Sequence, residues 1–105
     1  MMADWVRVCA RDEIEPDDML RFDHDGRTFV IYRTENDEFF ASDGLCTHEQ
    51  VHLEDGLLMD YVIECPKHNG RFDIRTGEGL GAPICEALAT YNLRFEGEDV
   101  LVEIP

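Results

Sequence analysis

The segment from residue 46 to residue 68 constrains the chain most, because it contains two of the four cysteines and three of the four histidines. Four of these side chains form two mixed pairs, Cys46 with His48 and Cys65 with His68. Sixteen residues, 49 to 64, separate the two pairs. A cysteine and a histidine two or three positions apart can face one metal from a single tight loop. The segment therefore predicts a metal centre that is held by two loops.

Two metal chemistries fit this set of donors. Zinc accepts two cysteines and two histidines, but its common structural spacing pairs cysteine with cysteine and histidine with histidine. In one kind of [2Fe-2S] centre, two histidines replace two cysteines on one of the irons. Each loop then supplies one cysteine to one iron and one histidine to the other, which requires a mixed pair on each loop. The spacing favours the iron-sulfur centre, and a structural zinc module stays open as the alternative.

Length and charge restrict what such a centre can serve. A chain of 105 residues is expected to form a single domain over residues 1–105. It carries 24 acidic and 9 basic side chains, for a net charge of -15. This charge argues against nucleic acids and anionic membrane surfaces as partners, and it favours basic proteins.

The expected location of the chain is the cytoplasm. Its first residues show no basic start followed by an apolar core, and no apolar run approaches the ~18 residues that span a membrane. Cysteines in such a chain are expected to be thiols or metal ligands before they are disulfides. Cys9 and Cys85 are therefore expected to be small apolar side chains within strands.

Outside the metal-binding segment, short stretches rich in β-branched and aromatic side chains predict strands. The predicted strands cover residues 5–9, 19–25, 28–34, 38–42, 71–74, 89–96 and 99–104. Asp-Gly and Asn-Asp in the first links tolerate positive φ in tight hairpins, so the first four strands are expected to form an antiparallel meander. No helical period appears beyond a turn in residues 11–19. The pattern predicts an all-β framework with an inserted module at about residues 43–83.

The stretches "CTH" (46–48) and "CPKHNGRFD" (65–73), at this spacing, resemble the Rieske iron-sulfur family, and the small acidic chain resembles its ferredoxins. The resemblance implies one [2Fe-2S] cluster. Cys46 and Cys65 would be thiolate ligands of the buried iron, and His48 and His68 would be imidazole ligands of the outer iron. It also implies an antiparallel β sandwich with a cluster-binding subdomain whose loops lie at one tip.

The chain departs from the Rieske proteins of respiratory and photosynthetic complexes at four positions. Those proteins carry an extra cysteine in each cluster loop, joined as a disulfide, but the corresponding positions here are Val51 and Lys67. They also carry hydroxyl side chains where this chain has Gly70 and Phe72. Hydroxyl donors to sulfur stabilise the reduced cluster, so their loss lowers the reduction potential.

Nearby carboxylates, Glu49, Glu54 and Asp55 among them, are expected to lower the potential further by repulsion of the added electron. The sequence therefore predicts a potential in the lower part of the Rieske range of about -150 to +300 mV. Such a protein would be a donor to low-potential acceptors.

With all four ligands bound to iron, no coordination site stays open for a substrate, so the chain is expected to carry electrons and not to be an enzyme. The resemblance implies a ferredoxin component of a ring-hydroxylating or demethylating oxygenase system. It would be a monomer that carries single electrons from an NAD(P)H-dependent flavoprotein reductase to a terminal Rieske non-haem iron oxygenase, in the catabolism of an aromatic or related compound. The alternatives are the zinc module and the small subunit of a two-subunit reductase that shares this fold.

The partner proteins are expected to contact the exposed imidazole edges of the two ligand histidines. Val51, Leu53 and Pro83 are expected to surround this contact spot. The remaining histidine of the segment, His52, is expected to be a solvated surface residue.

Overall fold

Strand β3 (Arg27–Arg33) is buried on both faces, and this burial determines how the chain is layered. Residues 29–32 are all 0% exposed. Because successive side chains of a strand point to opposite faces, Phe29 and Ile31 enter one hydrophobic cluster while Val30 and Tyr32 enter another. A continuous apolar run of this kind is typical of a strand that is covered on both sides. The computed structural model describes residues 4–47, 50–67, 70–81 and 86–105.

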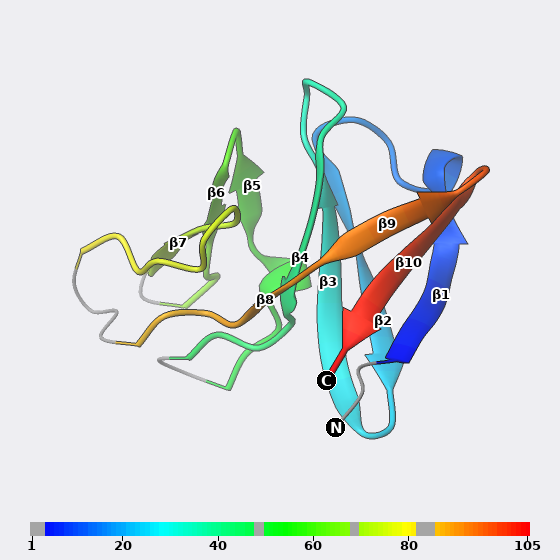
Figure 1. Ribbon diagram of the computed structural model, residues 1–105. Helices are drawn as coiled ribbons and strands as arrows, with labels where there is room; N and C mark the ends of the chain where they lie inside the picture. Colours follow the sequence, from blue (N-terminus) through cyan, green and yellow to red (C-terminus); the bar gives the residue numbers. More distant parts are fainter. Residues whose placement is uncertain (1–3, 48–49, 68–69, 82–85) are drawn as a thin grey trace.

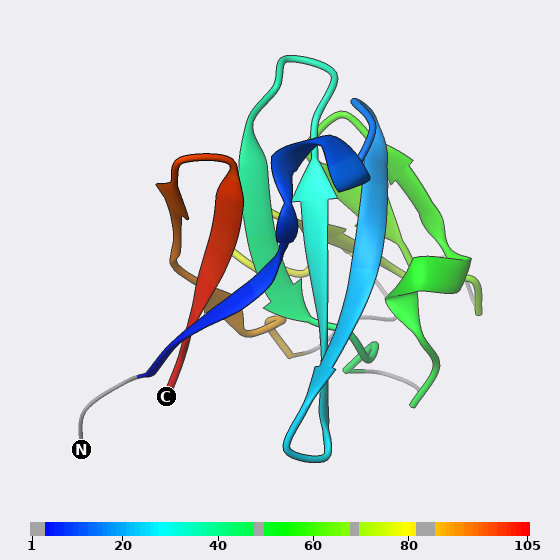
Figure 2. The ribbon, with the colours of Figure 1, turned by 90° about the vertical axis from the view of Figure 1, so that its right-hand side faces the viewer.

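Three antiparallel sheets build the molecule, and the sheet that contains β3 is the central layer (Figures 1 and 2). Its strand order is β2-β3-β4-β8, with β2 at Asp18–His24, β4 at Phe39–Asp43 and β8 at Thr90–Tyr91. The sheet on one side has the order β1-β10-β9, with β1 at Asp4–Ala10, β10 at Asp99–Ile104 and β9 at Leu93–Glu96. The small sheet on the other side has the order β5-β6-β7, with β5 at Leu57–Met59, β6 at Val62–Glu64 and β7 at Arg71–Asp73.

Each pair of neighbouring layers encloses one hydrophobic core. The core between the central sheet and β1-β10-β9 consists of Cys9, Ile14, Phe29, Ile31, Ala41, Val100, Val102 and Ile104. The core between the central sheet and β5-β6-β7 consists of Val30, Tyr32, Cys46, Leu53, Leu58, Ile63, Cys65, Phe72, Ile74 and Leu88. The prediction of an all-β, antiparallel sandwich is confirmed. The burial of Cys9 confirms that this cysteine fills the core, and Cys85 lies outside the described residues.

The predicted meander of four strands is wrong at its first strand. β2, β3 and β4 do form a meander, and Asp25 and Gly26 take the positive φ values of 50° and 77° that a tight hairpin needs. β1 instead pairs with β10 in the other sheet, where Asp4 lies opposite Ile104. The link after β1 is a 3-10 turn followed by an irregular stretch, not a tight hairpin, so the chain crosses from one sheet to the other there.

The small sheet occupies part of the predicted insertion, and two of its strands were not predicted. β5 and β6 are each three residues long, and Asp60 with φ 55° lies in the turn between them. Such short strands show too little alternation to stand out in a sequence. None of the described segments forms a helix that is long and apolar enough to cross a membrane.

Candidate metal centre

The first predicted ligand, Cys46, begins a loop that leaves the central sheet after β4. The Cys46 N–H donates a hydrogen bond of 3.0 Å to the carbonyl of Val51. Leu45 and His52 form an isolated antiparallel bridge just outside this bond. Cys46 and Val51 therefore close the base of the loop that they bound, and Cys46 lies at that base.

The second predicted ligand, Cys65, occupies the equivalent place in the hairpin between β6 and β7. The Cys65 N–H donates a hydrogen bond of 2.6 Å to the carbonyl of Gly70. Glu64 and Arg71 pair in the ladder just outside it, and their side chains form an ion pair of 2.9 Å. Each predicted Cys/His pair thus belongs to a loop whose closing hydrogen bond comes from the cysteine itself.

Both cysteines are buried in the same hydrophobic core. Cys46 is 1% exposed and Cys65 is 0% exposed, and the core around them also contains Leu53, Phe72 and Leu88. Thiolates at these positions would be shielded from water, as ligands of a buried iron require. His48 and His68 lie outside the described residues, and within the described ranges no group of three metal-binding side chains gathers. The placement and chemistry of the two cysteines fit a [2Fe-2S] cluster.

A third segment packs against the first loop. The Thr47 hydroxyl donates a hydrogen bond of 3.0 Å to the carbonyl of Glu86, which joins two stretches that lie far apart in the sequence. Two residues later in the chain, the Leu88 N–H donates a hydrogen bond of 2.7 Å to the carbonyl of Gly77. The first bond holds the stretch before β8 beside the loop of Cys46, and the second joins the same stretch to the segment after β7.

The electrostatic surroundings differ in part from the expectation. Glu54 accepts a hydrogen bond of 3.1 Å from Arg21 of β2, so its charge is compensated and repels an added electron less than expected. Asp55 is exposed, and Glu49 lies outside the described residues. The lowering of the potential by carboxylates therefore depends less on Glu54 than the sequence suggested.

The predicted contact spot is wrong at Leu53. Leu53 is 0% exposed and belongs to the core, because it begins the 3-10 turn η2 (Leu53–Asp55) that packs inward. Val51 is half-buried against the same core, and Pro83 lies outside the described residues. His52 is also half-buried instead of solvated, and its Nδ1 atom is buried without a hydrogen-bond partner in the described part of the chain.

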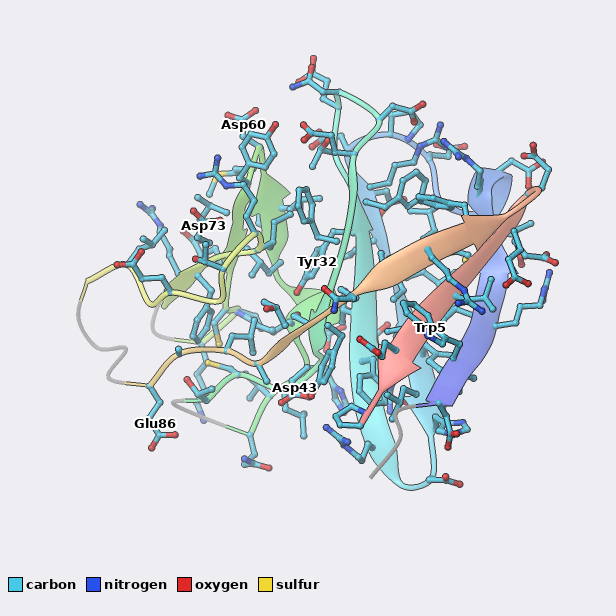
Figure 3. The ribbon with its side chains drawn as sticks, viewed as in Figure 1. Trp5, Tyr32, Asp43, Asp60, Asp73 and Glu86 are labelled. Atoms are coloured by element: carbon cyan, nitrogen blue, oxygen red, sulfur yellow. The ribbon has the colours of Figure 1, made fainter. Side chains whose placement is uncertain are left out.

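A polar network beside Cys46 carries no recognisable sequence signal. Arg27 Nη2 donates a hydrogen bond of 2.7 Å to the Tyr91 hydroxyl, and that hydroxyl donates a hydrogen bond of 2.6 Å to Asp43 Oδ1. Burial, together with the hydrogen bond to Asp43, raises the pKa of Tyr91 to about 12, so the phenol keeps its proton at neutral pH. Arg27, Asp43 and Cys46 also line one open cavity of about 380 Å³. Figure 3 shows Asp43 and Glu86 toward the same end of the molecule and Asp60 at the opposite end.

Comparisons with known proteins show which family the chain resembles. The family model described as Rieske [2Fe-2S] domain matches residues 4–92. The ferredoxin component of the naphthalene 1,2-dioxygenase system of Pseudomonas aeruginosa is 38% identical over 104 residues, which cover 99% of each chain. The biphenyl dioxygenase ferredoxin subunit of Pseudomonas sp. (strain KKS102) is 39% identical over 100 residues, which cover 94% of this chain and 91% of the relative.

A solved structure matches closely as well. It is the complex of reduced oxygenase and oxidized ferredoxin in carbazole 1,9a-dioxygenase. One chain of it superposes with a TM-score of 0.89 at 31% identity and covers 94% of this chain and 92% of its own length. The Rieske type of the sandwich, expected from the two motifs, is confirmed by this likeness.

Proposed function

The chain belongs to the Rieske [2Fe-2S] domain family, and on that premise we propose that it is a low-potential ferredoxin that carries single electrons to a terminal Rieske non-haem iron oxygenase. One observation carries the proposal: two cysteines at the bases of separate loops are buried in one core, and each is followed within three residues by a histidine. The ferredoxin relatives are electron-transfer components of dioxygenase systems and not catalysts.

Four side chains would hold one [2Fe-2S] cluster. Cys46 and Cys65 are proposed as ligands of the inner iron, and His48 and His68 as ligands of the outer iron. When bound, the cluster supplies reversible one-electron transfer. The chain's own contribution is to exclude water from the thiolates, through the burial of Cys46 and Cys65, and to fix both loops through their closing hydrogen bonds. Residues 1–105 would form one domain, with the cluster-binding part at about 43–83.

The proposed potential lies in the lower part of the range of about -150 to +300 mV. Phe72 is 0% exposed and belongs to the core that contains Cys65, and it carries no hydroxyl to donate to sulfur. Gly70 likewise has no side-chain donor. The net charge of -15 disfavours the addition of an electron as well.

The proposed partners are proteins. A flavoprotein reductase that uses NAD(P)H would supply the electrons, and the terminal oxygenase of a pathway that degrades an aromatic or related compound would receive them. The complex of oxygenase and ferredoxin among the similar structures supports the second partner. The acidic surface favours basic docking faces over nucleic acids or membranes. We place the protein in the cytoplasm as a monomer.

Analysis of the purified protein for iron, acid-labile sulfide and zinc tests the proposal. We expect equal amounts of iron and sulfide, visible absorption, and a reduced-state EPR signal whose average g value lies below that of all-cysteine [2Fe-2S] centres. Cys46→Ser and Cys65→Ser are each expected to lose the iron and the colour, because both remove a ligand of the same iron. Cys9→Ser is the matched control, because Cys9 is equally buried but lies in the other core.

A colourless protein that contains zinc would exclude the electron carrier and leave the structural zinc module. The reductase proposal has its own test. The oxidised protein should be bleached by NADH in the presence of the flavoprotein reductase from an aromatic dioxygenase system, and NADH alone should leave its colour unchanged. If it stays oxidised with such reductases but is reduced by dithionite, the cluster is established and the proposed electron donor is wrong.

A further inference from the structure

We propose that Arg27, Asp43 and Tyr91, here called the Asp43 network, position the loop of Cys46 and balance the charge beside it, and thereby adjust the reduction potential of the centre. All three would be positioning residues, since none is a proposed ligand. The inference rests on the proposed function, because it needs a cluster that is held by Cys46.

The Asp43 network joins three strands of the central sheet. Arg27 begins β3, Asp43 ends β4 and Tyr91 ends β8. Phe29 lies opposite Asp43 in the ladder, and Ala41 lies opposite Tyr91, so the three side chains share one face of the sheet. The two hydrogen bonds through the Tyr91 hydroxyl, of 2.7 and 2.6 Å, therefore link all three strand ends directly.

The buried aromatic ring of Phe29 packs against both Arg27 and Tyr91 of the network. The Arg27 guanidinium carbon lies 5.0 Å from the centre of the Phe29 ring and 5.7 Å from that of Tyr91. The Phe29 and Tyr91 rings meet edge to face at 5.2 Å. Phe29 is 0% exposed, so the guanidinium rests on a fixed surface. This arrangement holds the orientation of Arg27 as well as its charge.

The backbone beyond Asp43 is fixed just where the loop begins. The Asp43 N–H donates a hydrogen bond of 2.9 Å to the carbonyl of Ala89, and the Gly44 N–H donates one of 2.8 Å to the carbonyl of Thr28. A Cβ atom on Gly44 would lie 2.5 Å from Thr28 Cγ2, so the backbone packs against β3 too closely for any side chain at residue 44. Cys46 follows two residues later. The backbone that joins Asp43 to Cys46 is therefore held against β3 at Gly44.

The charges of the network face the same cavity as Cys46. Among the described residues that line it, Arg27 carries the one positive charge, and Asp43 and Glu86 carry negative charges. Arg27 Nη2 lies 3.6 Å from Asp43 Oδ1, so the guanidinium compensates that carboxylate. Loss of the guanidinium would leave uncompensated negative charge at the cavity that Cys46 also lines, and loss of the carboxylate would leave uncompensated positive charge there. The two losses should shift the reduction potential in opposite directions.

Redox titration and EPR of the holoprotein test this inference. Arg27→Gln is expected to lower the reduction potential, and Asp43→Asn is expected to raise it. Arg27→Lys keeps the charge and should restore the potential toward that of the wild type. Tyr91→Phe removes only the hydroxyl that joins the strands, and we expect a broadened EPR signal because the loop is held less firmly.

Matched controls lie elsewhere in the fold. Tyr61 lies in the turn between β5 and β6, and its hydroxyl donates a hydrogen bond to the Glu38 carboxylate. Tyr61→Phe removes this hydroxyl, just as Tyr91→Phe removes that of Tyr91. Arg94→Gln removes another arginine that stacks on an aromatic ring, that of Trp5, at 4.5 Å. Both controls should keep the potential and the EPR line shape of the wild type.

Potentials of Arg27→Gln and Asp43→Asn that match the controls, or that both move in the same direction, would overturn the inference. If the variants of the network change only the unfolding temperature, and keep the potential and EPR spectrum of the wild type, the network has only a structural role and the inference is wrong. If a substitution at Asp43 prevents cluster assembly, the comparison of Arg27→Gln with Arg27→Lys still decides the charge effect. A wild-type protein without iron and sulfide would instead refute the proposed function, so the two failures are distinguishable.

Discussion

At the scale of single residues, burial alone does not distinguish a proposed ligand from a core residue. Cys9 is 2% exposed in β1, and burial raises the pKa of its thiol to about 11. Cys46 and Cys65 are equally buried, but they lie at the bases of loops and their N–H groups close those loops. The loop position, and not the burial, separates the two proposed ligands from the structural cysteine.

Gly77 illustrates how strongly one residue can constrain the loops around the centre. It has a φ of 83°, and a Cβ atom would lie 1.8 Å from the Leu88 carbonyl oxygen. Gly77→Ala is therefore expected to lower the free energy of unfolding by about 3 kcal/mol or more. Alanine would be strained in the left-handed backbone conformation, and its Cβ atom would clash with the Leu88 carbonyl oxygen. Denaturant unfolding measures the loss, and the iron content reports whether the third segment still supports the site.

Gly97→Ala is the control for this substitution. Gly97 also has positive φ, 63°, but no atom lies within 4 Å of its would-be Cβ. Only the backbone strain of about 1–2 kcal/mol should appear there. Equal losses for the two substitutions would contradict the role given to the Leu88 contact.

At the scale of elements, a second polar network connects the small sheet to the central sheet. The Tyr61 hydroxyl in the turn after β5 donates a hydrogen bond to Glu38, which precedes β4. The Arg75 guanidinium lies 4.2 Å from the Tyr61 ring centre and donates to both carboxylate oxygens of Asp73, at 3.0 and 2.8 Å. This network comprises the end of β7 with the turn after it, the turn between β5 and β6, and the residue before β4, whereas the Asp43 network lies at the ends of β3, β4 and β8. The two networks therefore stabilise different junctions.

Stability should depend on pH through Asp73. Hydrogen bonds from the Arg75 side chain, and then from its backbone N–H, hold the pKa of the Asp73 carboxyl below its usual value of about 3.9. A lowered pKa in the folded state means that the contribution is complete above the unfolded pKa and is lost as pH falls through the folded one. We expect the unfolding temperature to fall as pH drops below about 4, and to fall less steeply in Arg75→Gln.

Arg94→Gln provides the comparison for this measurement. Arg94 pairs with Glu96 at 2.9 Å, and both side chains are about half exposed. Its removal should leave the acid limb of the pH profile unchanged. If Arg75→Gln and the wild type have parallel profiles, the Arg75–Asp73 pair does not contribute to acid stability.

At the scale of the whole molecule, the acidic charge is distributed over a three-layer sandwich whose small sheet forms one side (Figures 1 and 2). A net charge of -15 attracts cationic reactants over a distance that shrinks with salt, from about 30 Å at ~0.01 M to about 3 Å at ~1 M ionic strength. Long-range attraction of this kind raises encounter rates without a large interface.

Oxidation of the reduced protein by small complexes of opposite charge measures this field without a protein partner. The rate constant with a cationic oxidant, tris(1,10-phenanthroline)cobalt(III), should fall by roughly tenfold or more from low to high salt. The rate constant with the anion ferricyanide should rise over the same range, because screening removes repulsion. If both rate constants are independent of salt, the surface charge does not steer electron-transfer partners.

The pattern of residues by itself predicted the chemistry and most of the strands. Cysteine and histidine at fixed spacing specify a donor set locally, and β-branched or aromatic runs specify strands such as β3, since both depend on neighbours along the chain. Only the tertiary structure determined that β1 pairs with β10, that Leu53 is buried, and that Arg27, Asp43 and Tyr91 meet at the ends of three strands. These features depend on contacts between residues far apart in the sequence, and short-range patterns carry no information about such contacts.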